Sequence, residues 1–116
     1  MQTHPRGFEP RGCVDYNFNG IGDQLVIEPF PHMTNFTISF WIKTKQLGTG
    51  QNYWWEGKGL IDGDVPGKKV DYGVSLMEGG LIGFGIGSPW GDITLKSRRR
   101  VDDDEWRHVV VSRDYR

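Results

Sequence analysis

The sequence predicts an all-β protein, an antiparallel two-sheet β-sandwich of the jelly-roll kind, from three observations. Residues 36–44 alternate between apolar and polar side chains, which is typical of a strand with one face in a core. The 116 residues include 17 glycines and six prolines, a composition that disfavours long helices and favours turns. Turn residues separate about eight short segments, none of which has a helical period.

The central strand is predicted at 36–44, where the alternation is clearest. Further strands are predicted at 14–18, 24–28, 59–62, 70–77, 81–86, 93–97 and 106–112. Glu78-Gly79-Gly80 predicts the tight turn of a hairpin, because glycine supplies the backbone angles of such turns. Gly83 and Gly85 fall on one face of their strand, and a face without side chains lets a ring or another backbone come close.

Length and charge limit the class of protein. The chain suits one domain, with an irregular lead-in over residues 1–12. Fourteen basic and 15 acidic residues give a net charge of -1, which argues against a nucleic-acid module held by phosphate contacts. The sequence has no apolar run long enough to predict a membrane span, and its lead-in does not resemble a signal peptide. Cys13, the single cysteine, is expected to be a buried thiol.

Four segments, in a fixed order along the chain, carry a family resemblance. They are Tyr16-Asn17-Phe18-Asn19-Gly20 with Asp23 and Val26, then 36–43, then the hairpin of 72–76 and 81–85, and finally 104–114. In this order they resemble the laminin-G-like domain of the concanavalin A-like lectin/glucanase superfamily, over residues 13–116. Asn19 stands where that family usually has aspartate, and Arg107 replaces the first histidine of its tryptophan-histidine-histidine-valine strand.

The resemblance implies a lectin-like module, extracellular or at the cell surface, that binds carbohydrate or a glycosylated protein, in many relatives with calcium. Family members normally continue beyond the tryptophan strand, whereas this sequence stops at Arg116, so we expect the sandwich to lack its last strands. Exposed sheet edges would then favour an alternative: an assembly domain that forms a homo-oligomer and takes no small-molecule ligand. A third alternative is the ancillary part of a glycan-processing enzyme.

An aromatic ligand site is predicted at Tyr53, Trp54, Trp55 and Trp90. Their loops are polar and rich in glycine, and the C–H face of a sugar ring stacks on an exposed indole. The alternative is that one or two of these rings cover an open end of the sandwich. Two further tryptophans, at 41 and 106, lie in predicted strands and are expected in the core.

A calcium loop is the predicted role of Asp62 and Asp64. Asp62-Gly63-Asp64 begins like an EF-hand loop, because hard cations need several oxygen ligands on a flexible backbone. The pattern then fails, since Pro66 takes the fifth position and Gly73 the twelfth. A site of another kind remains as one interpretation, and ordinary solvated turn residues as the other. A second candidate pair is Asn19 with Asp23.

The pattern of the remaining charged residues predicts a solvated surface rather than a catalytic site. A basic run at 98–100 precedes an acidic run at 102–105, which indicates a solvated hairpin with cross-strand ion pairs. The alternative is contact with a sulfated glycan. Glucanases of the superfamily carry two glutamates and an aspartate at alternate positions of one strand. The sequence has no such pattern, so we expect no enzyme.

Overall fold

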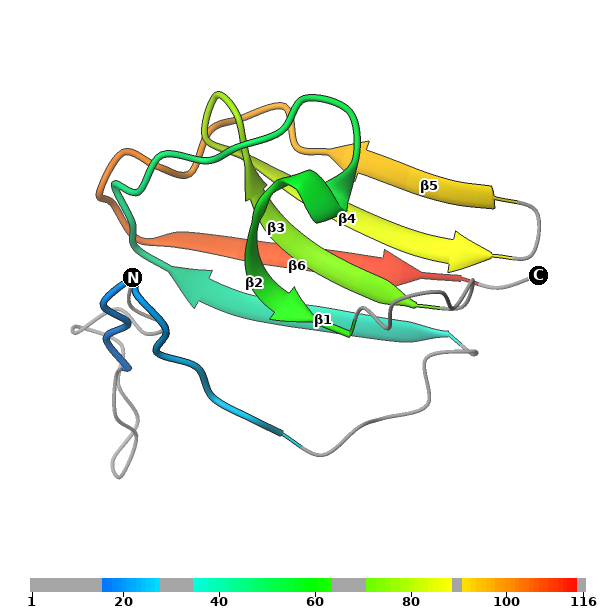
Figure 1. Ribbon diagram of the computed structural model, residues 1–116, viewed down its shortest axis with the longest axis horizontal. Helices are drawn as coiled ribbons and strands as arrows, with labels where there is room; N and C mark the ends of the chain where they lie inside the picture. Colours follow the sequence, from blue (N-terminus) through cyan, green and yellow to red (C-terminus); the bar gives the residue numbers. More distant parts are fainter. Residues whose placement is uncertain (1–15, 28–34, 64–70, 89–90, 115–116) are drawn as a thin grey trace.

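The structure, a computed structural model, describes residues 16–27, 35–63, 71–88 and 91–114, which form two antiparallel β-sheets (Figure 1). In chain order the elements are β1 (Phe36–Ile42), the 3-10 turn η2 (Trp54–Glu56), β2 (Lys58–Asp62), β3 (Tyr72–Met77), β4 (Leu81–Ser88), β5 (Gly91–Lys96) and β6 (Arg107–Arg113). The predicted all-β sandwich is therefore confirmed, and six of the predicted strands overlap β1 to β6.

The two sheets differ in width. Among the described strands β1 and β6 pair only with each other, starting with Phe36 opposite Arg113, while the other four lie in the order β2-β3-β4-β5. β3 and β4 form the predicted hairpin. Gly79 and Gly80 in its turn have φ angles of 84° and 77°, the left-handed region that glycine adopts without strain.

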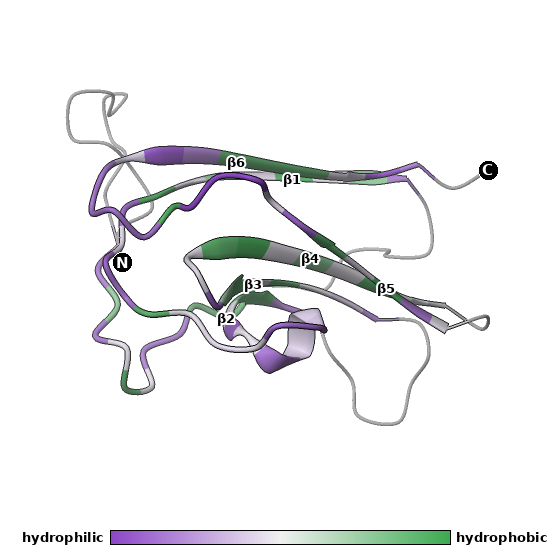
Figure 2. Ribbon diagram, turned by 90° about the horizontal axis from the view of Figure 1, so that it is seen from above, coloured by the Kyte–Doolittle hydropathy of each residue, from purple (hydrophilic) through white to green (hydrophobic). Residues whose placement is uncertain are grey.

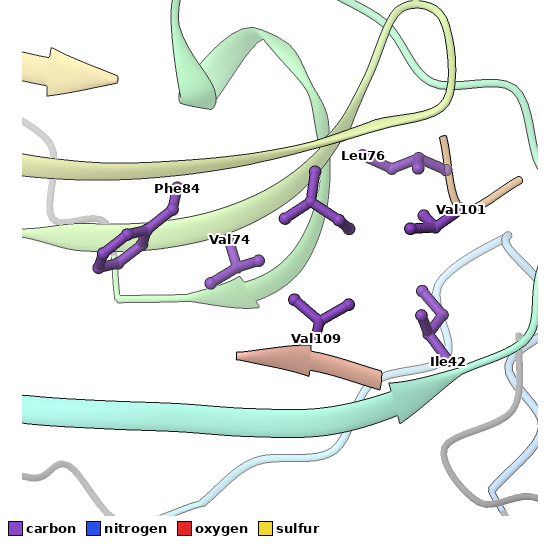
Figure 3. Packing of buried hydrophobic residues seen from close by; sticks show 7 residues of the cluster. Ile42, Val74, Leu76, Phe84, Val101 and Val109 are labelled. Atoms are coloured by element: carbon purple, nitrogen blue, oxygen red, sulfur yellow. The ribbon is translucent and has the colours of Figure 1, made fainter. Parts of the chain in front are cut away.

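The core lies between the two sheets, where their apolar faces meet (Figure 3). The ring of Phe36 in β1 meets the ring of Phe84 in β4 edge-on, with centroids 6.2 Å apart. Burying each large apolar side chain of this kind stabilises the fold by about 1.5–3 kcal/mol. The buried cluster consists of Ile42, Val74, Leu76, Ile82, Phe84, Val101 and Val109.

Two side chains, those of Trp54 and Met77, cover the glycines on the other face of the four-stranded sheet. Gly73 pairs with Gly85 and Ser75 with Gly83 across β3 and β4, which leaves this face almost without side chains. The indole of Trp54 occupies it, because a Cβ at Gly73 or Gly85 would overlap that ring. Figure 2 shows η2 on the side of this sheet that faces away from β1 and β6. The prediction that the glycine face admits a ring is confirmed.

One strip of the core face has no cover in the described part of the chain. Ile93 and Leu95 of β5 lie opposite Ile86 and Phe84 of β4, so their side chains point to the same face as the core. They are nevertheless 60% and 62% exposed. The cause is the difference in width, because β5 lies beyond β6 (Figure 1) and the narrower sheet has no third described strand opposite it.

Two predicted strands are wrong where the structure describes them. Residues 16–18 and 24–27 are not in strands, and the apolar side chains at 25–27 are exposed. An alternating or apolar pattern becomes a strand only where a neighbouring strand satisfies its backbone groups, and 16–27 have no such neighbour among the described residues. The lead-in at 1–12, Cys13 and the start of the first predicted strand lie outside the described residues.

The hairpin predicted between the basic and acidic runs is also wrong. β5 and β6 belong to different sheets, so the segment between them crosses from one layer to the other. Its ion pairs are local rather than cross-strand. Arg100 pairs with Asp102 at 2.6 Å, and Arg107 pairs with Asp103 four residues earlier.

The two tryptophans expected in the core are only half-buried. Trp41 points to the outer face of the β1–β6 sheet, where its ring stacks on His108 with centroids 4.8 Å apart. Trp106 precedes the first residue of β6. The alternation of β1 itself explains Trp41, because Phe40 and Ile42 occupy the inner face on either side of it.

Candidate functional site

A short loop before β2 presents aromatic side chains, and one carboxylate fixes its shape. Oε1 of Glu56 accepts hydrogen bonds from the backbone N–H groups of Asn52 and Tyr53, at 2.9 and 2.8 Å. The N–H of Glu56 donates in turn to the carbonyl of Tyr53 at 3.0 Å. These donors favour the charged carboxylate, so the bonds from Tyr53 and then Asn52 lower the pKa of Glu56 below its ordinary 4.5. The role of Glu56 in capping this turn was not predicted from the sequence, although a glutamate three residues after the residue that begins a turn is typical of such a cap.

The loop holds two rings in parallel at the surface. The rings of Tyr53 and Trp55 stack with centroids 4.5 Å apart and an interplanar angle of 3°. Their residues are 47% and 45% exposed, so the pair is open to solvent. Because each ring covers one face of the other, the outer faces and the edges of the stack remain open, and rings restrained in this way lose little side-chain entropy when a ligand binds.

A small hollow adjoins this pair, with a volume of about 90 Å³. Trp55 and Asp62 both line it, together with Ser75 on the floor supplied by β3. Asp62 ends β2 and is exposed. Burial, followed by the charge of Asp62, raises the pKa of Tyr72, the first residue of β3. The hollow thus combines an apolar ring with a hydrogen-bond acceptor.

Trp54 has a different position from its neighbours. It is 4% exposed, its backbone N–H donates to Oγ1 of Thr94 at 3.2 Å, and its backbone carbonyl accepts from Oγ of Ser75 at 2.6 Å. Its side chain anchors the loop on the sheet and also lines the hollow, but it is too buried to stack on a ligand as Tyr53 and Trp55 could. Its ring meets that of Trp55 at 84°, with centroids 5.8 Å apart, and so sets the orientation of the exposed pair. One of the four predicted site residues thus has a structural role, on the glycine face of the sheet rather than at an open end of the sandwich.

Of the other predicted site residues, Trp90 and Asp64 lie outside the described residues. Of the two aspartates predicted to bind calcium, the structure therefore describes Asp62 alone. In the ranges that the structure describes, no three His, Cys, Asp or Glu side chains are grouped closely enough to hold a metal ion.

The second candidate pair for calcium stabilises a turn. Oδ2 of Asp23 accepts from the N–H of Asn19 at 3.0 Å, and Oδ1 of Asn19 accepts from the N–H of Ile21 at 2.7 Å. Both side-chain oxygens therefore bind backbone groups of the same turn, as is common for Asn and Asp.

Comparisons with known proteins identify the family. Among the described residues, the structure has no helix with the length and apolar character that a bilayer span requires. Neither the curated proteins nor the solved structures gave a match. The family model described as concanavalin A-like lectin/glucanases superfamily matches residues 19–116, most of the chain. The chain therefore belongs to the laminin G family of the concanavalin A-like lectin/glucanases superfamily.

Proposed function

We propose that this protein is a non-catalytic binding module that recognises carbohydrate, either free or on a glycosylated protein, outside the cell or at its surface. The observation that carries the proposal is the parallel, half-exposed pair of Tyr53 and Trp55 beside the carboxylate of Asp62. The family supports a lectin-like or binding module in general terms.

The chemistry of sugars fits this arrangement. A pyranose ring has an apolar C–H face that packs on an indole and an equatorial rim of hydroxyl groups. With the ring stacked on Trp55, a hydroxyl on the rim would donate to Asp62. The hollow of about 90 Å³ is too small to enclose a sugar, so the ligand would lie across its mouth as the end or side of a longer glycan.

The experiment is a glycan array with the wild-type chain and three variants. Trp55→Ala is expected to abolish binding, and Asp62→Asn to weaken it about tenfold, the effect of losing one charge-assisted hydrogen bond. Tyr16→Ala is the matched control, because Tyr16 is 46% exposed, like Tyr53, but lies in the N-terminal segment. Equal binding by wild type and Trp55→Ala would remove this site.

Calcium is a separate part of the proposal. Asp62, with Asp64 of the following loop, would supply carboxylate oxygens to a calcium ion at this rim of the sandwich, since Ca²⁺ prefers such ligands. The array is therefore repeated with a chelator. A calcium site would be supported if the chelator abolished glycan binding and added calcium restored it. In Asp62→Asn, added calcium should no longer restore binding. Unchanged binding in chelator would exclude it and leave the stacking site intact.

A second candidate function is self-assembly, favoured by the exposed strip of Ile93 and Leu95. Two copies that pair along the edge of β6 that has no described neighbour would extend the two-stranded sheet and cover β5 in each copy. In a two-fold pairing centred on Val111, His108 of one copy would lie opposite Asp114 of the other, an attractive pair. This assembly leaves the aromatic loop uncovered, because η2 lies on the side of the four-stranded sheet that faces away from β1 and β6 (Figure 2).

A further inference from the structure

A polar pocket of about 470 Å³ lies at the end of β1, apart from the aromatic loop. One wall is the segment 43–46 that follows β1, another is the N-terminal turn, and Asp104 closes it from the segment before β6. Its volume is that of a site for a small molecule. The lining residues are Asn17, Phe18, Asn19, Gly20, Lys43, Thr44, Lys45, Gln46 and Asp104.

Two lysines give the pocket its charge. Lys43 and Lys45 flank Thr44, which is buried and also lines the pocket. Within the described ranges neither lysine is part of a salt bridge, whereas Arg100 and Arg107 both are. With one carboxylate at Asp104, the lining has one positive charge in excess, which favours a ligand with a single anionic group.

The wall around these lysines is fixed by hydrogen bonds. Oγ1 of Thr44 accepts from the N–H of Gln46 at 3.0 Å, and the carbonyl of Thr44 accepts from the N–H of Asp104 at 2.9 Å. Asp104 has a φ of 59°, and it is the one residue other than glycine with a positive φ among those described. A left-handed backbone at a non-glycine residue costs about 1–2 kcal/mol, and such residues concentrate at binding sites.

We propose that this pocket binds a sugar acid, a small polyhydroxylated molecule with one carboxylate. The carboxylate would lie between the ammonium groups of Lys43 and Lys45. The hydroxyl groups would donate to Asp104 and contact the side-chain amides of Asn17 and Gln46, which both donate and accept. The carboxylate of Asp104 favours a sugar acid over an anion without hydroxyl groups, because it repels negative charge and accepts hydrogen bonds from hydroxyl groups.

Three probes of matched chemistry test the proposal: sodium gluconate, sorbitol and sodium acetate, at constant ionic strength. Gluconate has the carboxylate and the polyol, sorbitol the polyol alone, and acetate the carboxylate alone. Backbone amide NMR shifts of residues 17–20 and 43–46 are the readout. Saturable shifts with gluconate, and at least about tenfold weaker binding of the other two, would support the proposal.

Variants assign the effect to the pocket. Lys43→Gln and Lys45→Gln are each expected to weaken gluconate about tenfold, the loss of one charge-assisted contact. Lys58→Gln is the control, because Lys58 is exposed on β2 and does not line the pocket. Trp55→Ala should bind gluconate normally, which separates this site from the carbohydrate site proposed above.

Two results would overturn the inference. Equal affinity for acetate and gluconate would mean an adventitious anion site with no recognition of hydroxyl groups. No saturable shift with gluconate, in a wild-type chain whose NMR spectrum is that of a folded protein, would mean that the pocket does not take this ligand class.

Discussion

The indole of Trp54 lies so close to the backbone of Gly85 that any side chain at position 85 would overlap its five-membered ring. This contact joins the aromatic loop to the centre of the four-stranded sheet. It also explains the glycine at position 85 of β4, since one face of the strand packs in the core and the other receives the ring, while Gly83 leaves room for the side chain of Met77. Trp54 thereby links the stability of the sheet to the position of the exposed rings.

Gly85→Ala is therefore expected to destabilise the protein by about 2 kcal/mol, because the ring must move or the strand must bend. The measurement is the free energy of unfolding in urea. Gly59→Ala in β2 is the control, because a Cβ there has nothing within 4 Å. That variant should change the free energy of unfolding by less than about 0.5 kcal/mol. Equal effects of the two substitutions would contradict the packing of Trp54 on this face.

Adjacent tryptophans should behave oppositely. Trp54→Ala removes a buried ring and is expected to cost about 3–5 kcal/mol, whereas Trp55→Ala removes a half-exposed one and should cost about 1 kcal/mol, the value of its stack. Trp54→Phe should be tolerated better than Trp54→Ala. Among the described residues the buried Nε1 of Trp54 has no hydrogen-bond partner, so its loss carries little penalty. Thermal unfolding of the three variants, with Trp55→Ala the least affected, checks the order.

The strands that pack on the core could be predicted from the sequence, for a physical reason. Period-2 alternation records which face of a strand is buried, and in β1 and β3 this face is the core cluster. The same reasoning predicted that a ring or another backbone would approach the glycine face of β4. It could not identify Trp54 as that ring, because Tyr53, Trp54 and Trp55 are chemically alike in sequence. Only the direction of the short turn buries the middle residue and exposes the others.

The features that could not be predicted depend on contacts between residues that are far apart in the sequence. Leu25, Val26 and Ile27 have strand-forming side chains, but no neighbouring strand satisfies their backbone in the described residues. The polar pocket at Lys43 brings together three segments that are far apart along the chain, and no spacing rule relates them. The local turn at Asn19 and Asp23 was predictable, because Asn and Asp bind backbone groups within a few residues.

Acid should loosen the aromatic loop through Glu56. The pKa of Glu56 is lowered in the folded chain from 4.5, so its contribution to stability is complete above pH 4.5 and is lost as the pH falls through the lowered value. Protonation weakens the hydrogen bonds from Asn52 and Tyr53 that hold the loop. We therefore expect the amide NMR signals of these two residues to shift together below pH 4.5. Glycan binding should decline over the same range.

Glu56→Gln tests the cause of this acid response. The amide oxygen of Gln still accepts hydrogen bonds but does not titrate in acid, so the shift of the Tyr53 amide below pH 4.5 should disappear. Glu105→Gln is the control, because Glu105 is exposed in the segment between β5 and β6. A Tyr53 amide that titrates identically in Glu56→Gln would assign the response to another group.

The exposed strip of β5 distinguishes assembly from a monomeric module. If two copies cover Ile93 and Leu95, the double variant Ile93→Lys/Leu95→Lys should convert a dimer into a monomer, measured by light scattering at matched concentrations. Leu47→Lys is the control, since Leu47 is a 78% exposed apolar residue outside the strands. The side chains at 93 and 95 already face solvent within one chain, so their replacement should cost the monomer about 0.5 kcal/mol or less. A wild-type chain that is monomeric at all concentrations tested would exclude assembly, and then the strip would be a solvent-exposed extension of the core.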